Sequence, residues 1–343
     1  MRETPRPRAS PTLLAATAVL GLGLAPRLVP FSYLDVVATA LVLAPAVMGL
    51  HLLHRTGLIS FGHGAFFGLG AYAGGFLSTF WDVTSLPVYL AAGVAAASGL
   101  GTAFGALVAR VGRSSCPVLT LALGQIVHAL FVSGAAFRPF GAVGQGFFLV
   151  GTGGLFIPRF PLAGPALPEP ASTVALYYTI LTAVAATGWV LWRVDRSPFG
   201  LALRAVGANE LRAACTGVPV RQYRWATFVI SAGAAGLGGA LSGQLYRQIT
   251  PQHLSWFFSA QLVFALILGG TARFSGPLVG TAAFVALQEV ALRSTQYRGL
   301  VLGAAIVALA RFLPNGLTGV CSRPAPVTGG EGARRPDAHA AAR

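Results

Sequence analysis

Apolar stretches long enough to cross a lipid bilayer recur along most of this chain, and they restrict it to one broad class of fold. A helix needs about 20 predominantly apolar residues to cross the hydrocarbon core. The candidates are ten in number and run roughly over 12–26, 33–53, 58–79, 87–109, 117–134, 173–192, 225–246, 254–271, 277–292 and 299–313. We therefore expect an all-α, polytopic transmembrane helical bundle of about ten spans. The sequence leaves open whether 57–79 and 135–172 cross the membrane or re-enter it.

Charge content excludes an ordinary soluble protein. Only 10% of the 343 residues are charged, whereas globular domains carry about 25%. We expect a cytoplasmic N-terminal tail over 1–11, a transmembrane domain over 12–320 and a disordered cytoplasmic tail over 321–343. No small-x-small cleavage site follows the first apolar stretch, so we expect that stretch to remain as an uncleaved helix.

The basic residues are all arginine, 24 of them, and the chain contains no lysine. A Walker A loop requires a lysine to reach the nucleotide phosphates, and a Schiff-base enzyme requires a lysine amine. Both mechanisms are therefore excluded, and any ATP that drives this protein must be bound by another chain. A nucleic-acid partner is not expected, because the arginines are spread between apolar runs rather than clustered on a soluble face.

The distribution of arginine predicts the orientation in the membrane. With a cytoplasmic N-terminus and ten crossings, 18 arginines fall at the inner side and 6 at the outer side, as the positive-inside rule requires. Both termini are then cytoplasmic. The three cysteines, Cys116, Cys215 and Cys321, also fall at the inner side, where thiols stay reduced; their spacing matches no metal site.

The inner connection over 193–224 is the most informative polar segment. It contains a helix-compatible core from Leu201 to Cys215 that ends at Gly217, a residue suited to the position after a helix. A short polar helix on the positive side of the membrane predicts a docking surface for a partner. The alternative is an amphipathic connector that lies on anionic lipid.

Small residues recur at helical spacing in two of the expected spans. Such residues allow helix backbones to approach closely in a membrane, and we predict packing contacts at Gly64, Gly68, Gly70, Gly74, Gly236 and Gly239. Ser60 and His63 precede the first group. They are candidates for a polar translocation path, or for hydrogen bonds to their neighbours.

Ionisable residues within the expected spans are few. Glu289 and Arg293 lie at i, i+4 and are predicted to form a structural ion pair, with a cargo contact as the alternative. The scarcity of buried carboxylates argues against a proton- or sodium-driven carrier. His51 and His54 lack the glutamate of an H-E-x-x-H zinc site, and no G-x-S-x-G elbow is present. We therefore expect neither a catalytic site nor a bound metal.

Five segments together resemble a known family. They are "GLISFGHGAFFGLGAYAGG" at 57–75, "LTLALGQIV" at 119–127, "SPFGLALRAVGANELRAACTGVPVRQYRWATFVISAGAAGLGGALSG" at 197–243, "LILGGTARFSGPLVGTAAF" at 266–284 and "LPNGLTGV" at 313–320. In this order they resemble the permease subunits of bacterial branched-chain amino acid ABC importers.

The resemblance implies a multi-pass subunit of the bacterial cytoplasmic membrane that moves branched-chain or related small amino acids inward. Its implied partners are two ATPase subunits, a second homologous permease or a copy of itself, and a periplasmic or lipid-anchored solute-binding protein. No cofactor is implied in this chain, because ATP binds to the partner subunits. The residues implied to contact the ATPase are Arg204, Asn209, Glu210, Arg212, Ala213, Ala214 and Gly217.

One departure from the family bears on the cargo. Relatives commonly have Gly-Glu-Ile-x-Arg where this chain has Gly124-Gln125-Ile126-Val127-His128, so a neutral hydrogen-bonding pair replaces an ion pair. Gln125 and His128 join Ser60 and His63 as candidates for the translocation path. A urea or short-chain amide permease is the alternative within the family, and a stand-alone secondary carrier or channel is the alternative outside it.

Overall fold

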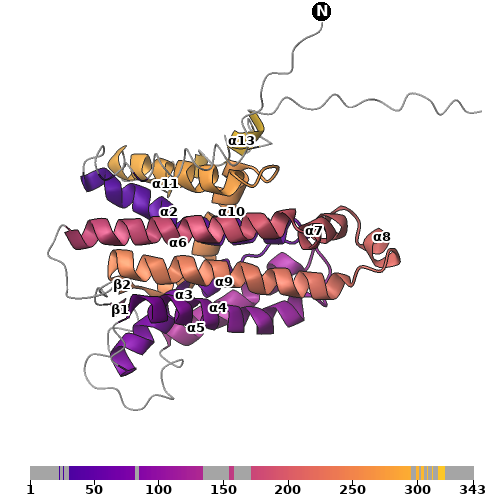
Figure 1. Cartoon of the computed structure of the whole chain (residues 1–343), viewed down its shortest axis with the longest axis horizontal. Helices are drawn as coiled ribbons and strands as arrows, with labels where there is room; N and C mark the ends of the chain where they lie inside the picture. The colour runs from indigo at the N-terminus through magenta and orange to yellow at the C-terminus, as the bar shows by residue number, and fades with distance from the viewer. Residues whose placement is uncertain are drawn as a thin grey trace, which may run out of the picture.

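A computed structural model describes residues 31–81, 85–133, 154–157, 171–294 and 316–320, together with isolated residues at 23 and 26 and between 299 and 311. The described part is a bundle of long apolar helices with one short β pair (Figure 1), which confirms the predicted all-α polytopic fold. Four helices have the length and composition to cross a bilayer, over Tyr33–His54, Leu86–Val108, Ala171–Arg196 and Val220–Tyr246. Most of the expected first and last spans, and both predicted tails, lie outside the described residues.

Each of the eight expected spans between 33 and 292 coincides with one helix. The helices of the bundle are α2 (Phe31–His54), α3 (His63–Trp81), α4 (Leu86–Val108), α5 (Cys116–Val132), α6 (Ala171–Arg196), α9 (Val220–Tyr246), α10 (Trp256–Gly269) and α11 (Gly276–Ser294). The shorter elements are α7 (Pro198–Ala208), α8 (Glu210–Cys215), the 3₁₀ helix η3 (Pro251–Leu254), α13 (Gly316–Val320), and the antiparallel strands β1 (Leu155–Phe156) and β2 (Gln248–Ile249).

Helix α9 is the centre of the bundle and packs against α2, α3 and α4. Its glycines allow this, because the backbones of the neighbours occupy the space that a side chain would need. A Cβ at Gly239 would meet the Phe67 carbonyl of α3, and one at Gly236 would lie 2.7 Å from the Gly93 carbonyl of α4. Contacts of this kind between small residues associate helices in membranes, where no hydrophobic effect drives association.

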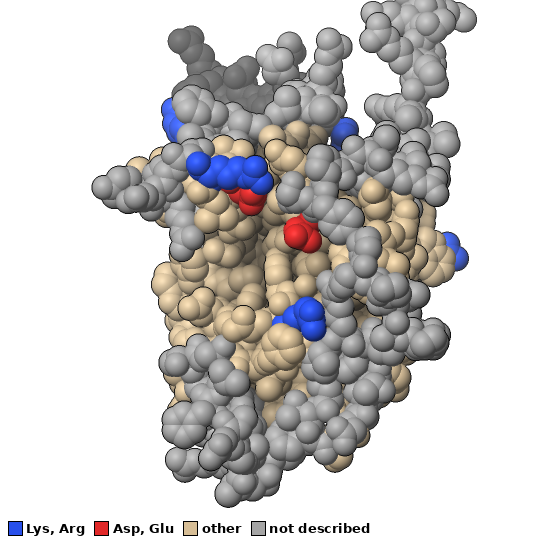
Figure 2. Space-filling model, turned by 90° about the vertical axis from the view of Figure 1, so that its left-hand side faces the viewer, with Lys and Arg blue, Asp and Glu red and all other residues tan. Residues whose placement is uncertain are grey.

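The two ends of the bundle differ in structure. Helices α7 and α8 lie at one end, on the right in Figure 1, and the β pair lies at the other. The C-terminal ends of α2 and α6 belong to the α7–α8 end, because Arg55 and Asp195 form an ion pair there. Figure 2 shows the opposite end, where the described surface is mostly neither basic nor acidic.

Helix α3 begins later than the sequence predicts. The expected span starts at residue 58, but residues 57–62 are not helical and the helix begins at His63. In this segment side chains satisfy the backbone donors, which is how serine and threonine compete with a helix. The Phe61 amide donates to Thr120 Oγ1 (3.1 Å) and the Gly62 amide to Ser60 Oγ (3.2 Å). Gly57, with φ of +78°, supplies the turn after α2.

The helix expected over Leu201–Cys215 is also interrupted. It is divided into α7 and α8 at Asn209, whose backbone is extended. The Asn209 side chain accepts a hydrogen bond from the Arg212 amide (3.0 Å) and so forms the N-cap of α8. The prediction of one continuous helix was therefore wrong, because an asparagine in this position caps a new helix more favourably than it continues the old one.

Candidate functional site

The surface formed by α7 and α8 is the candidate functional site, since residues 197–219 are the longest fully described connection between two long helices and contain both short helices. Ser197 begins α7 as its N-cap and Pro198 occupies the first turn, the position that proline favours. Gly200, Leu203 and Val206 form the buried face of α7. The exposed residues of α7 are Pro198, Leu201, Arg204, Ala205 and Ala208.

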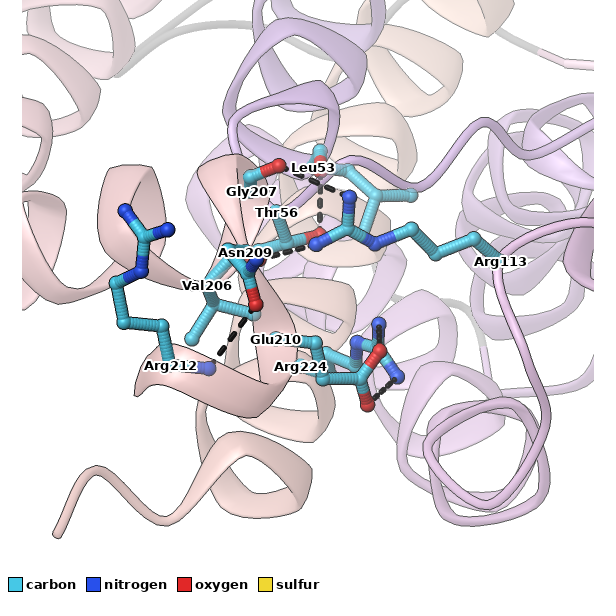
Figure 3. A network of polar contacts seen from close by, with 9 residues as sticks. All are labelled: Leu53, Thr56, Arg113, Val206, Gly207, Asn209, Glu210, Arg212 and Arg224. Carbon is cyan, nitrogen blue, oxygen red and sulfur yellow. Dashed lines mark hydrogen bonds and ion pairs between the residues drawn. The ribbon is translucent and has the colours of Figure 1, made fainter. Parts of the chain in front are cut away.

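Glu210 is held by an arginine at the start of α9. Its two carboxylate oxygens accept hydrogen bonds from both terminal nitrogens of Arg224, at 2.9 and 2.7 Å (Figure 3). Arg224 is only 3% exposed, whereas the Glu210 side chain is 43% exposed. A bidentate pair of this kind fixes orientation as well as charge, so Glu210 anchors α8 to the bundle.

Asp195, in the last turn of α6, is a second anchor. It is buried, and its Oδ1 atom lies 3.4 Å from both Arg55 Nε and Arg204 Nη1. The carboxylate thereby joins the ends of α2 and α6 to α7. Asp195 is not among the residues predicted from the sequence, although an acid among arginines at the end of an apolar helix is the signal that points to it.

Arg113, in the turn between α4 and α5, is the third anchor. Its guanidinium donates to the Gly207 carbonyl (2.9 Å) and to the Val206 carbonyl, both in the last turn of α7 (Figure 3). The C-terminal carbonyls of a helix lack intrahelical donors, and the arginine supplies them. In the sequence Arg113 is one of the arginines that mark the inner side, and nothing there indicates its contact with α7.

The exposed face of α7 and α8 is partly apolar. Leu201 is 66% exposed and Leu211 is 79% exposed. Of the seven residues expected to contact an ATPase, the exposed ones are Arg204, Asn209, Arg212, Ala214 and Gly217. Glu210 is partly exposed within its ion pair, and Ala213 is buried against the bundle at 4% exposure.

The candidates for a translocation path divide into two places. Ser60 and His63 are completely buried, and His63 Nε2 lies 2.6 Å from Ser231 Oγ of α9. Gln125 and His128 are partly buried on α5. Within the described chain no hydrogen bond joins Gln125 or His128 to the other pair. The structure therefore gives His63 a polar neighbour that the sequence did not indicate.

The remaining predicted residues lie away from the surface of α7 and α8. Glu289 Oε1 accepts a hydrogen bond from Arg293 Nε (2.6 Å) on α11, and the Arg293 guanidinium lies 5.2 Å from the Tyr33 ring centre at the start of α2. The six glycines predicted for packing all lie at close contacts with neighbouring elements. Among the described residues no group of three metal-ligating side chains occurs.

Comparison with known proteins assigns a family to most of the chain. The sequence model described as "Branched-chain amino acid transport system / permease component" matches residues 32–310. The permease protein LivM of the high-affinity branched-chain amino acid transport system of Escherichia coli is 25% identical over 319 residues, which cover 89% of this chain and 74% of LivM.

Two further relatives cover somewhat less of the chain. The permease protein LivH of Salmonella typhimurium, from the same kind of system, is 24% identical over 77% of this chain and 86% of its own length. A putative glucose ABC transporter permease protein of Haloferax volcanii, TsgC13, is 29% identical over 75% of this chain and 76% of its own length. No solved structure gives a significant match.

Proposed function

The chain belongs to the family of permease components of branched-chain amino acid transport systems, and we propose that it imports leucine, isoleucine, valine or related small amino acids as the membrane-spanning subunit of an ATP-driven importer. The observation that carries this proposal is the match of one family over residues 32–310, which includes all the long helices described above. A multi-pass helical bundle with one prominent polar surface at one end is consistent with that role.

In this proposal the surface of α7 and α8 contacts a partner in two ways. The side chains of Leu201 and Leu211 supply an apolar contact, and those of Arg204 and Arg212 supply a polar one. Exposed apolar residues beside arginines are typical of the centre of a protein interface. The partner is an ATPase subunit, one of two in the complex. We attribute ATP binding and hydrolysis to those subunits and no catalytic step or cofactor to this chain, because it contains no lysine for a P-loop.

The other proposed partners are a second homologous permease, or a copy of this chain, and a periplasmic or lipid-anchored solute-binding protein. The names of LivM and LivH relatives support a system with more than one permease chain. Several α5 side chains that would suit such a contact are apolar and exposed: Val118, Ile126, Leu130 and Val132.

The proposed location is the bacterial cytoplasmic membrane, with α7 and α8 on the cytoplasmic side. Arginine supports this orientation through the positive-inside rule. Within the described helices and turns, the arginines at the α7–α8 end are Arg55, Arg110, Arg113, Arg193, Arg196, Arg204, Arg212, Arg221, Arg224 and Arg273. Arg247 and Arg293 lie at the opposite end.

Ser60, His63, Gln125 and His128 remain our candidates for the polar lining of the translocation path. They are polar side chains without a carboxylate or guanidinium group, within an apolar bundle, so they suit a polar cargo that crosses without ion coupling. A sugar is the second candidate cargo, because a relative of similar coverage is named as a putative glucose permease. Urea or a short-chain amide is the third.

The test of cargo is uptake into proteoliposomes that contain the assembled complex of this permease, its partner permease and both ATPases, with the solute-binding protein added outside. Radiolabelled leucine, glucose, urea and acetamide are compared at equal concentration, with ATP trapped inside. The proposal predicts that leucine accumulates and that unlabelled isoleucine and valine compete with it. Accumulation of glucose or urea without leucine would replace the proposed cargo by that solute.

A further inference from the structure

Three segments far apart in the sequence meet at the cytoplasmic end of the bundle. They are the last turn of α7, the turn between α4 and α5 that carries Arg113, and the turn between α2 and α3 at Gly57. The Arg113 guanidinium bonds two carbonyls of α7 on one side. On its other side it lies against Gly57, where an added Cβ would be only 3.0 Å from Arg113 Cζ. Arg113 therefore contacts both segments at once.

The contact between α7 and the α2–α3 turn is also direct. A Cβ at Gly207 would clash with the Arg55 carbonyl and would lie 3.5 Å from the Gly57 amide nitrogen. Arg55 itself is paired with Asp195 of α6. With the backbones this close and the ion pairs around them, a displacement of the α7 C-terminus is transmitted to Gly57 rather than absorbed by loose packing.

Residues 57–62, which we call the hinge segment, connect this contact to the interior. The hinge segment forms no helix between the Gly57 amide, which donates to the His54 carbonyl (2.9 Å), and the Gly62 carbonyl, which accepts from the Ala65 amide (3.0 Å), and it leads directly into the first turn of α3. The hinge segment and that turn together contact three other helices. The Phe61 amide bonds Thr120 of α5, His63 bonds Ser231 of α9, and the Gly64 amide donates to Ser259 Oγ of α10 at 2.8 Å.

We propose that Arg113 is a positioning residue that couples α7 to the hinge segment, so that a movement of α7 changes the position of the buried polar groups around His63. This inference rests on the proposed function, in which an ATPase moves α7. A side chain that donates to two carbonyls of α7 and also lies against Gly57 needs a planar group with several donors. The arginine guanidinium is such a group, whereas the ammonium group of lysine is not.

A movement of the hinge segment would change the hydrogen bonds of the buried polar groups around His63. Ser60, His63, Thr120, Ser231 and Ser259 are each at most 1% exposed and come from four helices and the hinge segment. Their hydrogen bonds depend on the placement of the hinge segment, because it supplies two of the donors. A shift of the α3 start would therefore exchange these partners, and this is a discrete change of the kind that opens or closes a path.

The experiment compares three variants of the assembled complex in proteoliposomes: Arg113→Ala, Arg113→Lys and, as the matched control, Arg110→Ala. Arg110 is exposed in the same turn. The measured quantity is the number of leucine molecules moved per ATP hydrolysed. We expect R113A to lower it about tenfold, within the usual range of coupling between sites, R113K to lower it less, and R110A to leave it unchanged.

Hydrogen–deuterium exchange supplies a readout that a merely stabilising residue would not change. In the wild-type complex, trapping the ATPases with vanadate should alter exchange in both 198–208 and 57–62. In R113A the response of 198–208 should persist and the response of 57–62 should be lost. A wild-type transport ratio in R113A, or a retained response in 57–62, overturns the inference.

The outcomes also separate this inference from the function on which it rests. If the wild-type complex shows no ATP-driven leucine uptake, the proposed function is contradicted. If the wild type transports and R113A transports equally well per ATP, only the role of Arg113 is contradicted. Should R113A fail to assemble, R113K decides, since a wild-type ratio in that variant contradicts the proposal as clearly.

Discussion

Arg224 carries its charge in an almost completely buried position at the start of α9, and the Glu210 carboxylate compensates that charge with two hydrogen bonds. The cost of leaving such a charge without its partner is larger than the net gain of forming the pair. Glu210 thus has a structural task within the chain in addition to the contact with an ATPase that the resemblance implies.

Replacing Glu210 by alanine is expected to destabilise the subunit by about 1–3 kcal/mol, because hydrogen bonds to a charged group are lost and the carboxylate is partly exposed. Thermal unfolding of the purified subunit in detergent measures this loss. Arg212→Ala in the same helix is the control and should leave the unfolding temperature unchanged, since the Arg212 side chain is exposed. An unchanged unfolding temperature in E210A would contradict the role assigned to this pair.

Single residues at the α7–α8 surface could be predicted only in part. Glu210 and Gly217 stood out because of their spacing and the helix end between them. Asp195 and Arg113 did not, since the partners that join them to other helices, Arg55 and the Val206 carbonyl, are 140 and 93 residues away in the chain, although Arg204, the other partner of Asp195, is only nine residues away. Long-range ion pairs depend on how helices are arranged, and a pattern along the chain does not contain that arrangement.

At the scale of helices, the small residues of α9 determine how closely α3 and α4 approach. Gly70 of α3 lies against Gly236, and Gly101 of α4 lies against Ala232, whose Cβ would be 2.5 Å from a Cβ at position 101. Because these contacts involve backbone atoms or the Cβ of an alanine, a larger residue cannot be accommodated by rotating a side chain. The helices would have to separate.

Gly239→Ala should therefore destabilise the bundle by about 1–3 kcal/mol, the usual cost of overpacking, although alanine is the better helix former. Gly99→Ala in α4 is the matched control, because nothing lies within 4 Å of a Cβ at that position. It should be neutral or stabilising by up to about 1 kcal/mol through helix propensity. Chemical denaturation in mixed micelles compares the two variants, and equal effects would contradict the packing described for α9.

Helix positions could be predicted from apolar length, but several helix starts could not. Hydropathy extends the span of α3 back to residue 58 because Leu58, Ile59 and Phe61 are apolar. The helix nevertheless starts at His63, because Thr120 of another helix binds the preceding backbone. Likewise α10 starts only at Trp256, where the Ser255 side chain accepts the Phe258 amide hydrogen bond (3.3 Å).

At the scale of the whole molecule, the proposed function requires that α7 and α8 face the cytoplasm. Cys215 in α8 is exposed and Cys116 is buried, so the chain carries a natural probe for this side. The fold class and the family followed from features spread over the entire sequence, namely the recurrence of apolar stretches and the order of five segments. Signals of this kind do not depend on any single residue. The fold class and the family were therefore predicted more fully than the candidate site.

With Cys116 and Cys321 replaced by serine, a membrane-impermeant maleimide should label Cys215 in inside-out vesicles and leave it unlabelled in intact spheroplasts. Phe156→Cys, introduced into a chain that also lacks Cys215, provides the opposite case, because Phe156 is exposed in β1 at the other end. It should be labelled in spheroplasts only. Labelling of Cys215 from outside would reverse the orientation.

For the molecule as a whole, the central claim is that ATP hydrolysis by partner subunits drives transport. One measurement tests this claim directly. Leucine accumulation is followed in proteoliposomes of the complete complex that contain either trapped ATP or an imposed proton gradient without ATP. A chain without lysine, and with few charges inside the bundle, predicts accumulation with ATP and none with the gradient. Accumulation driven by the gradient alone, or by this chain without its ATPases, would contradict the account.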